Sequence, residues 1–183
     1  MNLRLLPNII TILRIVLVAP IVWLLIEQHY TWALILFAVA GVSDALDGFL
    51  ARHFHWQSWW GSVLDPLADK LLQVSCYITL AWTGHIPVWL VTAIVLRDLV
   101  IVSGALIYHR KVTAFEAEPS IISKFNTFVQ IIVILMVVMH IGLYALPENV
   151  LTAMFWLVLF TTVYSGVDYV YRWTHRAVKH RAD

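Results

Sequence analysis

The chain has 183 residues, of which 61% are hydrophobic and only 13% charged, and its mean hydropathy is +0.82. Soluble domains carry about 25% charged residues, so the composition excludes an ordinary soluble domain and indicates a membrane protein. The net charge of +1 is too small to suggest nucleic-acid binding, and the single cysteine excludes an intrachain disulfide.

Hydropathy and helix-breaking residues predict an all-α protein with six transmembrane helices. The predicted spans cover residues 8–27, 31–52, 61–82, 86–108, 120–143 and 149–171. Tight turns alternate with longer polar connections along the chain, as expected where successive crossings return to two sides of a bilayer. The length leaves no room for an additional soluble domain, so a single membrane domain over residues 1–183 is predicted.

Basic residues at the ends of the spans and beyond them all fall on one side of the predicted topology. They are Arg4, Arg52, Arg110, Lys111, Arg172, Arg176, Lys179 and Arg181. The tight turns contain none, so the positive-inside rule predicts that both termini and the longer connections are cytoplasmic. The apolar start resembles a signal peptide, but Arg14 and Pro20 interrupt it, and we expect a membrane helix there.

Aromatic residues and histidines near the span ends predict contacts with the membrane interface. The tryptophans concerned are Trp23, Trp32, Trp82, Trp89, Trp156 and Trp173. His29, His85 and His140 are expected on the side opposite the cytoplasmic connections. Their scatter does not predict a metal site.

Four aspartates occur in two neighbouring predicted spans, at Asp44, Asp47, Asp65 and Asp69. At 100° per residue, Asp44 and Asp47 share one helix face, and Asp65 and Asp69 share a face of the next helix. Adjacent antiparallel helices therefore bring four carboxylates together within the inner leaflet.

Four unpaired aspartates at mid-helix would cost on the order of 10 to 14 kcal/mol, so something must compensate them. Arg52 and Lys70 neutralise at most two of the charges. Divalent cations prefer oxygen ligands and can neutralise the rest, which predicts a metal site acting on a phosphate-bearing substrate. Cation or proton transporters also use intramembrane aspartates, so transport stays open on charge alone.

The spacing of these residues is more specific than their charge. The segment Asp44-x-x-Asp47-Gly48-x-x-Ala51-Arg52 is followed, after eight residues, by Gly61-x-x-x-Asp65-x-x-x-Asp69. This pattern resembles the signature of the CDP-alcohol phosphatidyltransferase family at every fixed position. The resemblance implies a six-helix, commonly dimeric membrane enzyme that binds a CDP-linked lipid with divalent metal. It favours an enzyme over a transporter, and the intact acidic motif argues against an inactive scaffold.

The resemblance also implies roles for the motif residues. The metal ligands would be Asp44, Asp47, Asp65 and Asp69, holding one or two Mg²⁺ or Mn²⁺ ions. Asp69 would take the proton from the attacking hydroxyl as general base. The site for the CDP-lipid would be lined by Asp47, Gly48, Ala51, Arg52 and Gly61.

Residues outside the motif bear on the acceptor alcohol. The opening at residues 7–14 resembles bacterial phosphatidylglycerophosphate synthases and cardiolipin synthases of this superfamily, and it adds Asn8 and Arg14 as contacts for the CDP-lipid. Alternatively, Arg14 extends to the interface. Residues 64–70, 97–98 and 119–130 resemble the cardiolipin synthases related to the mitochondrial enzyme. Phosphatidylglycerol is therefore the expected acceptor, and glycerol 3-phosphate is the alternative.

Cations in the later spans are candidates for binding the phosphate of the acceptor or of the CDP-lipid. They are Arg97, Lys124 and Arg110. A structural ion pair between Arg97 and Asp98 is the alternative for Arg97, and Asp168 is expected to be structural. The resemblance implies CDP-diacylglycerol as the substrate and a homodimer as the assembly. The compact chain shows no targeting extension, so a bacterial inner membrane is the expected location.

Overall fold

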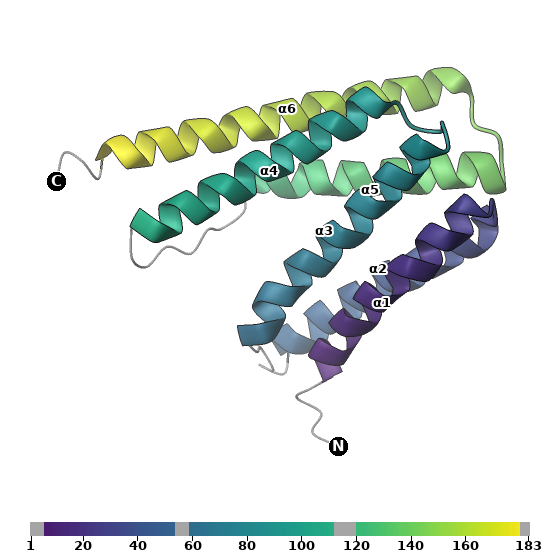
Figure 1. The fold of residues 1–183 in the computed structure, drawn as a ribbon, viewed down its shortest axis with the longest axis horizontal. Coiled ribbons are helices and arrows are strands. Elements are labelled where there is room, and N and C mark those ends of the chain that lie inside the picture. Colours follow the sequence, from purple (N-terminus) through teal and green to yellow (C-terminus); the bar gives the residue numbers. More distant parts are fainter. Residues whose placement is uncertain (1–5, 54–58, 112–119, 180–183) are drawn as a thin grey trace. The chain divides into compact units, whose positions relative to one another are not determined.

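The computed structural model describes the backbone of residues 6–53, 59–111 and 120–179, and these residues form six α-helices and no strand (Figure 1). Side chains are described for residues 10–44, 64–104 and 120–172. The helices are α1 (Leu6–Ile26), α2 (Tyr30–His53), α3 (Trp59–Trp82), α4 (Val88–Lys111), α5 (Ile121–Gly142) and α6 (Glu148–Lys179). The prediction of an all-α protein with six helices is confirmed for the described residues, and the crossing of a membrane by all six stays a prediction.

The observed helices match the predicted spans closely, except at the end of α6. The predicted span ended at residue 171, whereas the helix continues to Lys179. Asp168 and Arg172 form an ion pair of 2.8 Å one turn apart, which supports the helix at the point where its sequence becomes polar. Hydropathy marks where apolar sequence stops, and a helix stabilised by such pairs continues beyond that point.

The chain divides into two compact units, and the first comprises residues 1–86 and 135–145. Within it, α1 packs against both α2 and α3. Ile21 and Leu25 of α1, Ala33 of α2 and Leu80 of α3 are almost completely buried. Small and branched apolar side chains thus hold the three helices together at the ends remote from the aspartates.

The end of α5 approaches the start of α2 very closely in the first unit. A Cβ atom added to Gly142 would lie 2.6 Å from the Cβ atom of Tyr30. Real Cβ atoms do not approach this closely, so only glycine fits at this crossing. Backbone contact at Gly142 therefore sets the distance between the two helix ends.

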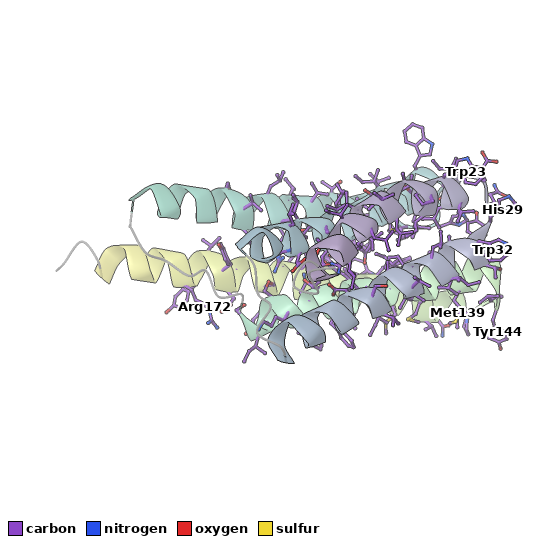
Figure 2. All side chains as sticks on the ribbon, turned by 90° about the horizontal axis from the view of Figure 1, so that it is seen from below. Trp23, His29, Trp32, Met139, Tyr144 and Arg172 are labelled. Atoms are coloured by element: carbon purple, nitrogen blue, oxygen red, sulfur yellow. The ribbon has the colours of Figure 1, made fainter. Side chains whose placement is uncertain are left out.

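A polar contact closes the same end of the first unit. Tyr30 of α2 lies with its hydroxyl 3.2 Å from Nε2 of His85, in the turn between α3 and α4. Burial, and secondarily the neighbouring His140, lower the pKa of His85 from its usual value of 6.5. Figure 2 shows that Trp23, His29, Trp32, Met139 and Tyr144 lie at one end of this unit.

The second unit comprises residues 87–134 and 146–183. Here α4 and α6 pack side by side (Figure 1). Hydrogen bonds join the first half of α5 to α6, between Asn126 or Gln130 and the hydroxyls of Thr161 and Thr162. This unit therefore combines apolar packing with polar side chains that bond to one another inside it.

Two helices of the described part are long and apolar enough to cross a membrane. They are Ile121–Gly142, with a hydropathy of 2.1, and Glu148–Arg172, with a hydropathy of 1.8. In contrast, α3 carries Asp65, Asp69 and Lys70 in its first half. The side chains predicted to meet the interface are exposed at Trp23, Trp32, Trp82, Trp89 and Trp156, while Trp173 lies outside the described side chains.

We expect Gly142→Ala to destabilise the protein by about 1–3 kcal/mol, because the new methyl group overpacks the contact with Tyr30. The matched control is Gly41→Ala, since a Cβ atom at Gly41 meets nothing within 4 Å. Thermal unfolding of the two variants in detergent measures the difference. Equal midpoints for both variants would contradict the close approach.

A second prediction concerns pH. Because His85 has a lowered pKa in the folded protein, the unfolded chain binds more protons as pH falls below about 6.5, so acid destabilises the fold. Thermal unfolding between about pH 7.5 and about pH 5.5 should show a smaller loss of stability for His85→Gln than for the wild type. His29→Gln, at an exposed position, is the control, and it should keep the wild-type dependence.

Candidate functional site

Arg14 of α1 is the centre of the candidate site. Its side chain is only 2% exposed, and it forms two ion pairs of 2.5 Å, from Nη2 to Asp44 and from Nη1 to Asp69. One guanidinium thus joins a carboxylate of α2 to a carboxylate of α3. The interpretation that Arg14 extends to the membrane interface is wrong, because these buried ion pairs hold it inside the first unit.

Thr11 lies one turn before Arg14 and extends the same polar face of α1. Its hydroxyl donates a hydrogen bond to Asp65 of α3, and the residue is completely buried. Three of the four predicted aspartates, Asp44, Asp65 and Asp69, therefore converge on α1. This convergence is what the shared helix faces predicted.

Several predicted site residues lie outside the described side chains. These are Asn8, Asp47, Gly48, Ala51, Arg52, Gly61 and Arg110. Their proposed roles stay predictions, although all seven belong to helices whose backbone the structure describes. Asp47, the fourth aspartate of the motif, is one of these residues.

The carboxylates of the described site residues are negatively charged and partly exposed to solvent. Asp44 and Asp69 have side chains 43% and 49% exposed, whereas the arginine between them is buried. Arg14 balances one of the three negative charges, and carboxylate oxygens are the ligands that Mg²⁺ and Mn²⁺ prefer. No three potential ligands among the described residues form a metal site by themselves. The donor type fits a hard cation, with Asp47 as the further ligand that the motif predicts.

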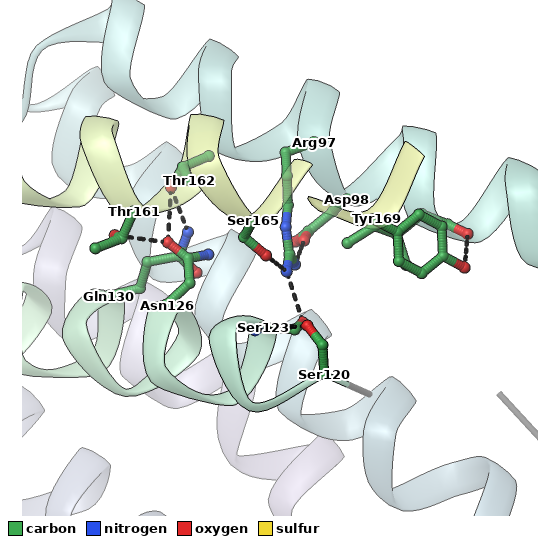
Figure 3. A network of polar contacts seen from close by, with 11 residues as sticks. Arg97, Asp98, Ser120, Ser123, Asn126, Gln130, Thr161, Thr162, Ser165 and Tyr169 are labelled. Atoms are coloured by element: carbon green, nitrogen blue, oxygen red, sulfur yellow. Dashed lines mark hydrogen bonds and ion pairs between the residues drawn. The ribbon is translucent and has the colours of Figure 1, made fainter. Parts of the chain in front are cut away.

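A second polar cluster surrounds Arg97 in the second unit (Figure 3). Arg97 is 6% exposed. Its Nη1 donates to Asp98 at 2.8 Å, and its Nη2 donates to the hydroxyls of Ser123 and Ser165 at 2.6 Å each. The ion pair with Asp98 proposed as a structural alternative does form, and the two serines from α5 and α6 fix the guanidinium further.

Hydroxyl and amide groups continue this cluster between α5 and α6. Asn126 accepts hydrogen bonds from Thr161 and Thr162 at 2.8 and 3.0 Å, and Gln130 donates to Thr162 at 3.1 Å. The hydroxyl of Tyr169 donates to the backbone of Ile101 at 3.1 Å. Sequence reasoning did not predict these contacts of α6, although residues 161, 162, 165 and 169 share one face of an otherwise apolar helix.

The remaining predicted residues are arranged differently. Lys124 is exposed on the first turns of α5 and is not part of the hydrogen-bonded cluster around Arg97. Asp168 pairs with Arg172 on the same helix, which agrees with the structural role expected for it.

The family model described as CDP-alcohol phosphatidyltransferase matches residues 4–164, which include Arg14, Thr11 and the aspartates of the first cluster and Arg97 of the second. The chain belongs to the CDP-alcohol phosphatidyltransferase family. The predicted resemblance is confirmed, and this family is generally dependent on divalent metal.

Curated relatives carry the names of two kinds of family member. A probable cardiolipin synthase (CMP-forming) of Drosophila melanogaster is 36% identical over 147 residues, covering 71% of this chain and 45% of that protein. The human cardiolipin synthase (CMP-forming) is 37% identical over 145 residues, covering 70% and 48%. The CDP-diacylglycerol–glycerol-3-phosphate 3-phosphatidyltransferase of Bacillus subtilis is 30% identical over 185 residues, covering 90% and 92%. The chain thus spans about half the length of the first two relatives.

We expect Arg14→Met to lower the free energy of unfolding by about 3–5 kcal/mol, because it leaves Asp44 and Asp69 without their buried cation. Excess MgCl₂ should raise the thermal midpoint of this variant more than that of the wild type, since a bound divalent ion relieves the repulsion.

The matched control for that variant is Arg172→Met, which removes an exposed ion pair and should change stability by less than about 1 kcal/mol. Thermal unfolding with and without MgCl₂ measures all three proteins. Equal midpoints for the two variants would show that Arg14 does not organise the carboxylates.

Proposed function

We propose that this protein acts in phospholipid biosynthesis by transferring the phosphatidyl group of CDP-diacylglycerol to the hydroxyl of phosphatidylglycerol, which yields cardiolipin and CMP. The observation that carries this proposal is the convergence of Asp44, Asp65 and Asp69 on one face of α1, within a family that uses CDP-alcohols. Because the aligned parts cover only about half of the first two relatives, their activity is proposed here and not transferred directly.

In this proposal, Asp44, Asp47, Asp65 and Asp69 hold one or two Mg²⁺ or Mn²⁺ ions. The bound metal would offset the negative charge of the pyrophosphate and of the departing CMP. Arg14 fixes the carboxylates of Asp44 and Asp69 in position, and Thr11 does the same for Asp65. The helices thus present their ligands already oriented, which is the condition for metal binding close to lipid.

Asp69 is the proposed general base. Its Oδ1 is held by Arg14, while its side chain is 49% exposed, so Oδ2 is the oxygen proposed to accept the proton of the acceptor hydroxyl. That hydroxyl then attacks the lipid-side phosphorus directly, the bond from this phosphorus to the CMP oxygen breaks, and CMP departs. No covalent intermediate on the enzyme is needed. The CDP-lipid would lie along Asp47, Gly48, Ala51, Arg52, Gly61, Asn8 and Arg14.

The choice of acceptor rests on the relatives. Two relatives at 36% and 37% identity are named cardiolipin synthases, which favours phosphatidylglycerol. Glycerol 3-phosphate is the alternative, favoured by the Bacillus subtilis relative, 92% of which aligns with this chain. Either acceptor carries a phosphate, for which Arg97, Lys124 and Arg110 are the proposed partners.

The proposed setting is a homodimer whose six helices all cross a bacterial inner membrane, with both termini and the active site cytoplasmic. Two crossing helices in the described part and the family itself support a membrane protein. The positions of the basic residues support the orientation. Residues 1–183 would form a single membrane domain.

Release of CMP by the purified protein tests this function. With CDP-diacylglycerol and MgCl₂, we expect CMP and cardiolipin from phosphatidylglycerol, identified by mass. We expect Asp69→Asn to lower the rate by about 100- to 10,000-fold, because the amide cannot accept the proton. Asp168→Asn, the same change outside the site, is the control and should keep most of the activity.

Two other results would change the proposal. Phosphatidylglycerophosphate formed from glycerol 3-phosphate, with no cardiolipin, would keep the mechanism and replace the acceptor. Failure to release CMP with either alcohol would contradict an enzymatic role. It would favour cation transport, the alternative function that the charge of the aspartates alone left open.

A further inference from the structure

A hollow of about 670 Å³ lies along α4 and α6 in the second unit. It extends from Ala93 to Val100 on α4, a length of about 10 Å at the helical rise. Small residues leave the space open, since Ala93 and Gly166 face it and a Cβ atom at Gly166 would already lie 3.6 Å from Cγ of Arg97. We call this hollow the α4–α6 groove.

The lining of the α4–α6 groove is aliphatic and accessible. Leu96 and Val100 of α4 and Val163 and Val167 of α6 are all exposed and all line it. The α6 wall belongs to a helix that is long and apolar enough to cross a membrane, and a groove on such a helix would open to hydrocarbon. An occupant of this space must therefore be apolar along most of its length.

One polar group is built into the wall of the groove. Arg97 lines it, is 6% exposed, and is held by Asp98, Ser123 and Ser165. Its Nε donor is buried and has no hydrogen-bond partner among the described residues. A buried donor of this kind calls for an oxygen acceptor from outside.

The combination of an aliphatic groove with one buried donor distinguishes between two occupants. A transmembrane helix of a second copy already uses its backbone oxygens in its own hydrogen bonds. A phospholipid instead offers a hydrocarbon chain together with ester and phosphate oxygens at one end. The groove therefore matches a lipid better than a helix.

We propose that the α4–α6 groove binds an acyl chain of the phospholipid acceptor, and that Arg97 donates its Nε–H to an oxygen at the glycerol end of that lipid. This inference rests on the proposed function, because it requires that the acceptor be a lipid. The donor lipid, CDP-diacylglycerol, is not the proposed occupant of this groove, because its pyrophosphate is proposed to lie at the aspartates of the first unit. The groove would then select phosphatidylglycerol over glycerol 3-phosphate, which has no chain to place there.

The test is the dependence of KM on acyl chain length for the full chain in mixed micelles. Ala93→Leu fills the groove from α4, and Gly166→Leu fills it from α6. Each should raise KM for dioleoyl-phosphatidylglycerol about tenfold and leave KM for the dihexanoyl lipid within about twofold, because only the long chain loses its apolar contacts. Ala153→Leu, the same change at an exposed position of α6 outside the groove, should behave as the wild type.

A second experiment measures binding of the lipid and does not require catalytic turnover. Phosphatidylglycerol with a photoactivatable group on one acyl chain should label α4 and α6 peptides that line the groove, and Ala93→Leu should reduce this labelling by at least about threefold. Labelling that stays equal in wild type and variant would overturn the proposal even if kinetic effects were present.

Other outcomes would overturn it in distinguishable ways. A change in KM for CDP-diacylglycerol alone would show that the groove binds the donor lipid. Unchanged KM values with a shift from dimer to monomer would show that the groove contacts a second copy of the chain. Cardiolipin formation that is equal in all variants would refute the groove and leave the proposed function intact. A wild type that uses only glycerol 3-phosphate would refute both.

Discussion

The buried guanidinium of Arg14 is the constraint on which the first unit depends. A cation that is 2% exposed within apolar helices must be paired, and it is paired with a carboxylate from each of two other helices, at Asp44 and Asp69. The same contacts that make this burial possible fix α1 against α2 and α3. Stability and function are therefore coupled, because any change that frees the aspartates also loosens the bundle.

The second unit stabilises its buried cation with a different set of partners. Arg97 meets one carboxylate and two serine hydroxyls, and a further row of amides and hydroxyls continues between α5 and α6 (Figure 3). These partners hold Arg97 away from water and leave its Nε without a partner among the described residues, whereas Asp44 and Asp69 stay about half exposed. The first arrangement suits groups that exchange protons and metal. The second suits a rigid wall that orients a ligand.

Sequence analysis predicted the aspartates and their shared faces because a charge in an apolar helix is too costly to be accidental. It named Arg14 as a contact for the CDP-lipid but did not predict its ion pairs, since its partners lie 30 and 55 positions away in the chain. Thr161, Thr162 and Ser165 were missed because a hydroxyl is inexpensive in such helices and can bond to its own backbone. The acceptor is equally hard to predict, because both candidates present a phosphate.

The most direct test of the central claim is anomalous diffraction at the manganese edge from crystals grown with MnCl₂ and CDP-diacylglycerol. The account predicts manganese bound by oxygens of Asp44, Asp47, Asp65 and Asp69, next to the pyrophosphate of the lipid. Manganese absent from these carboxylates while the CDP-lipid is bound, or bound at a different group of residues, would contradict it.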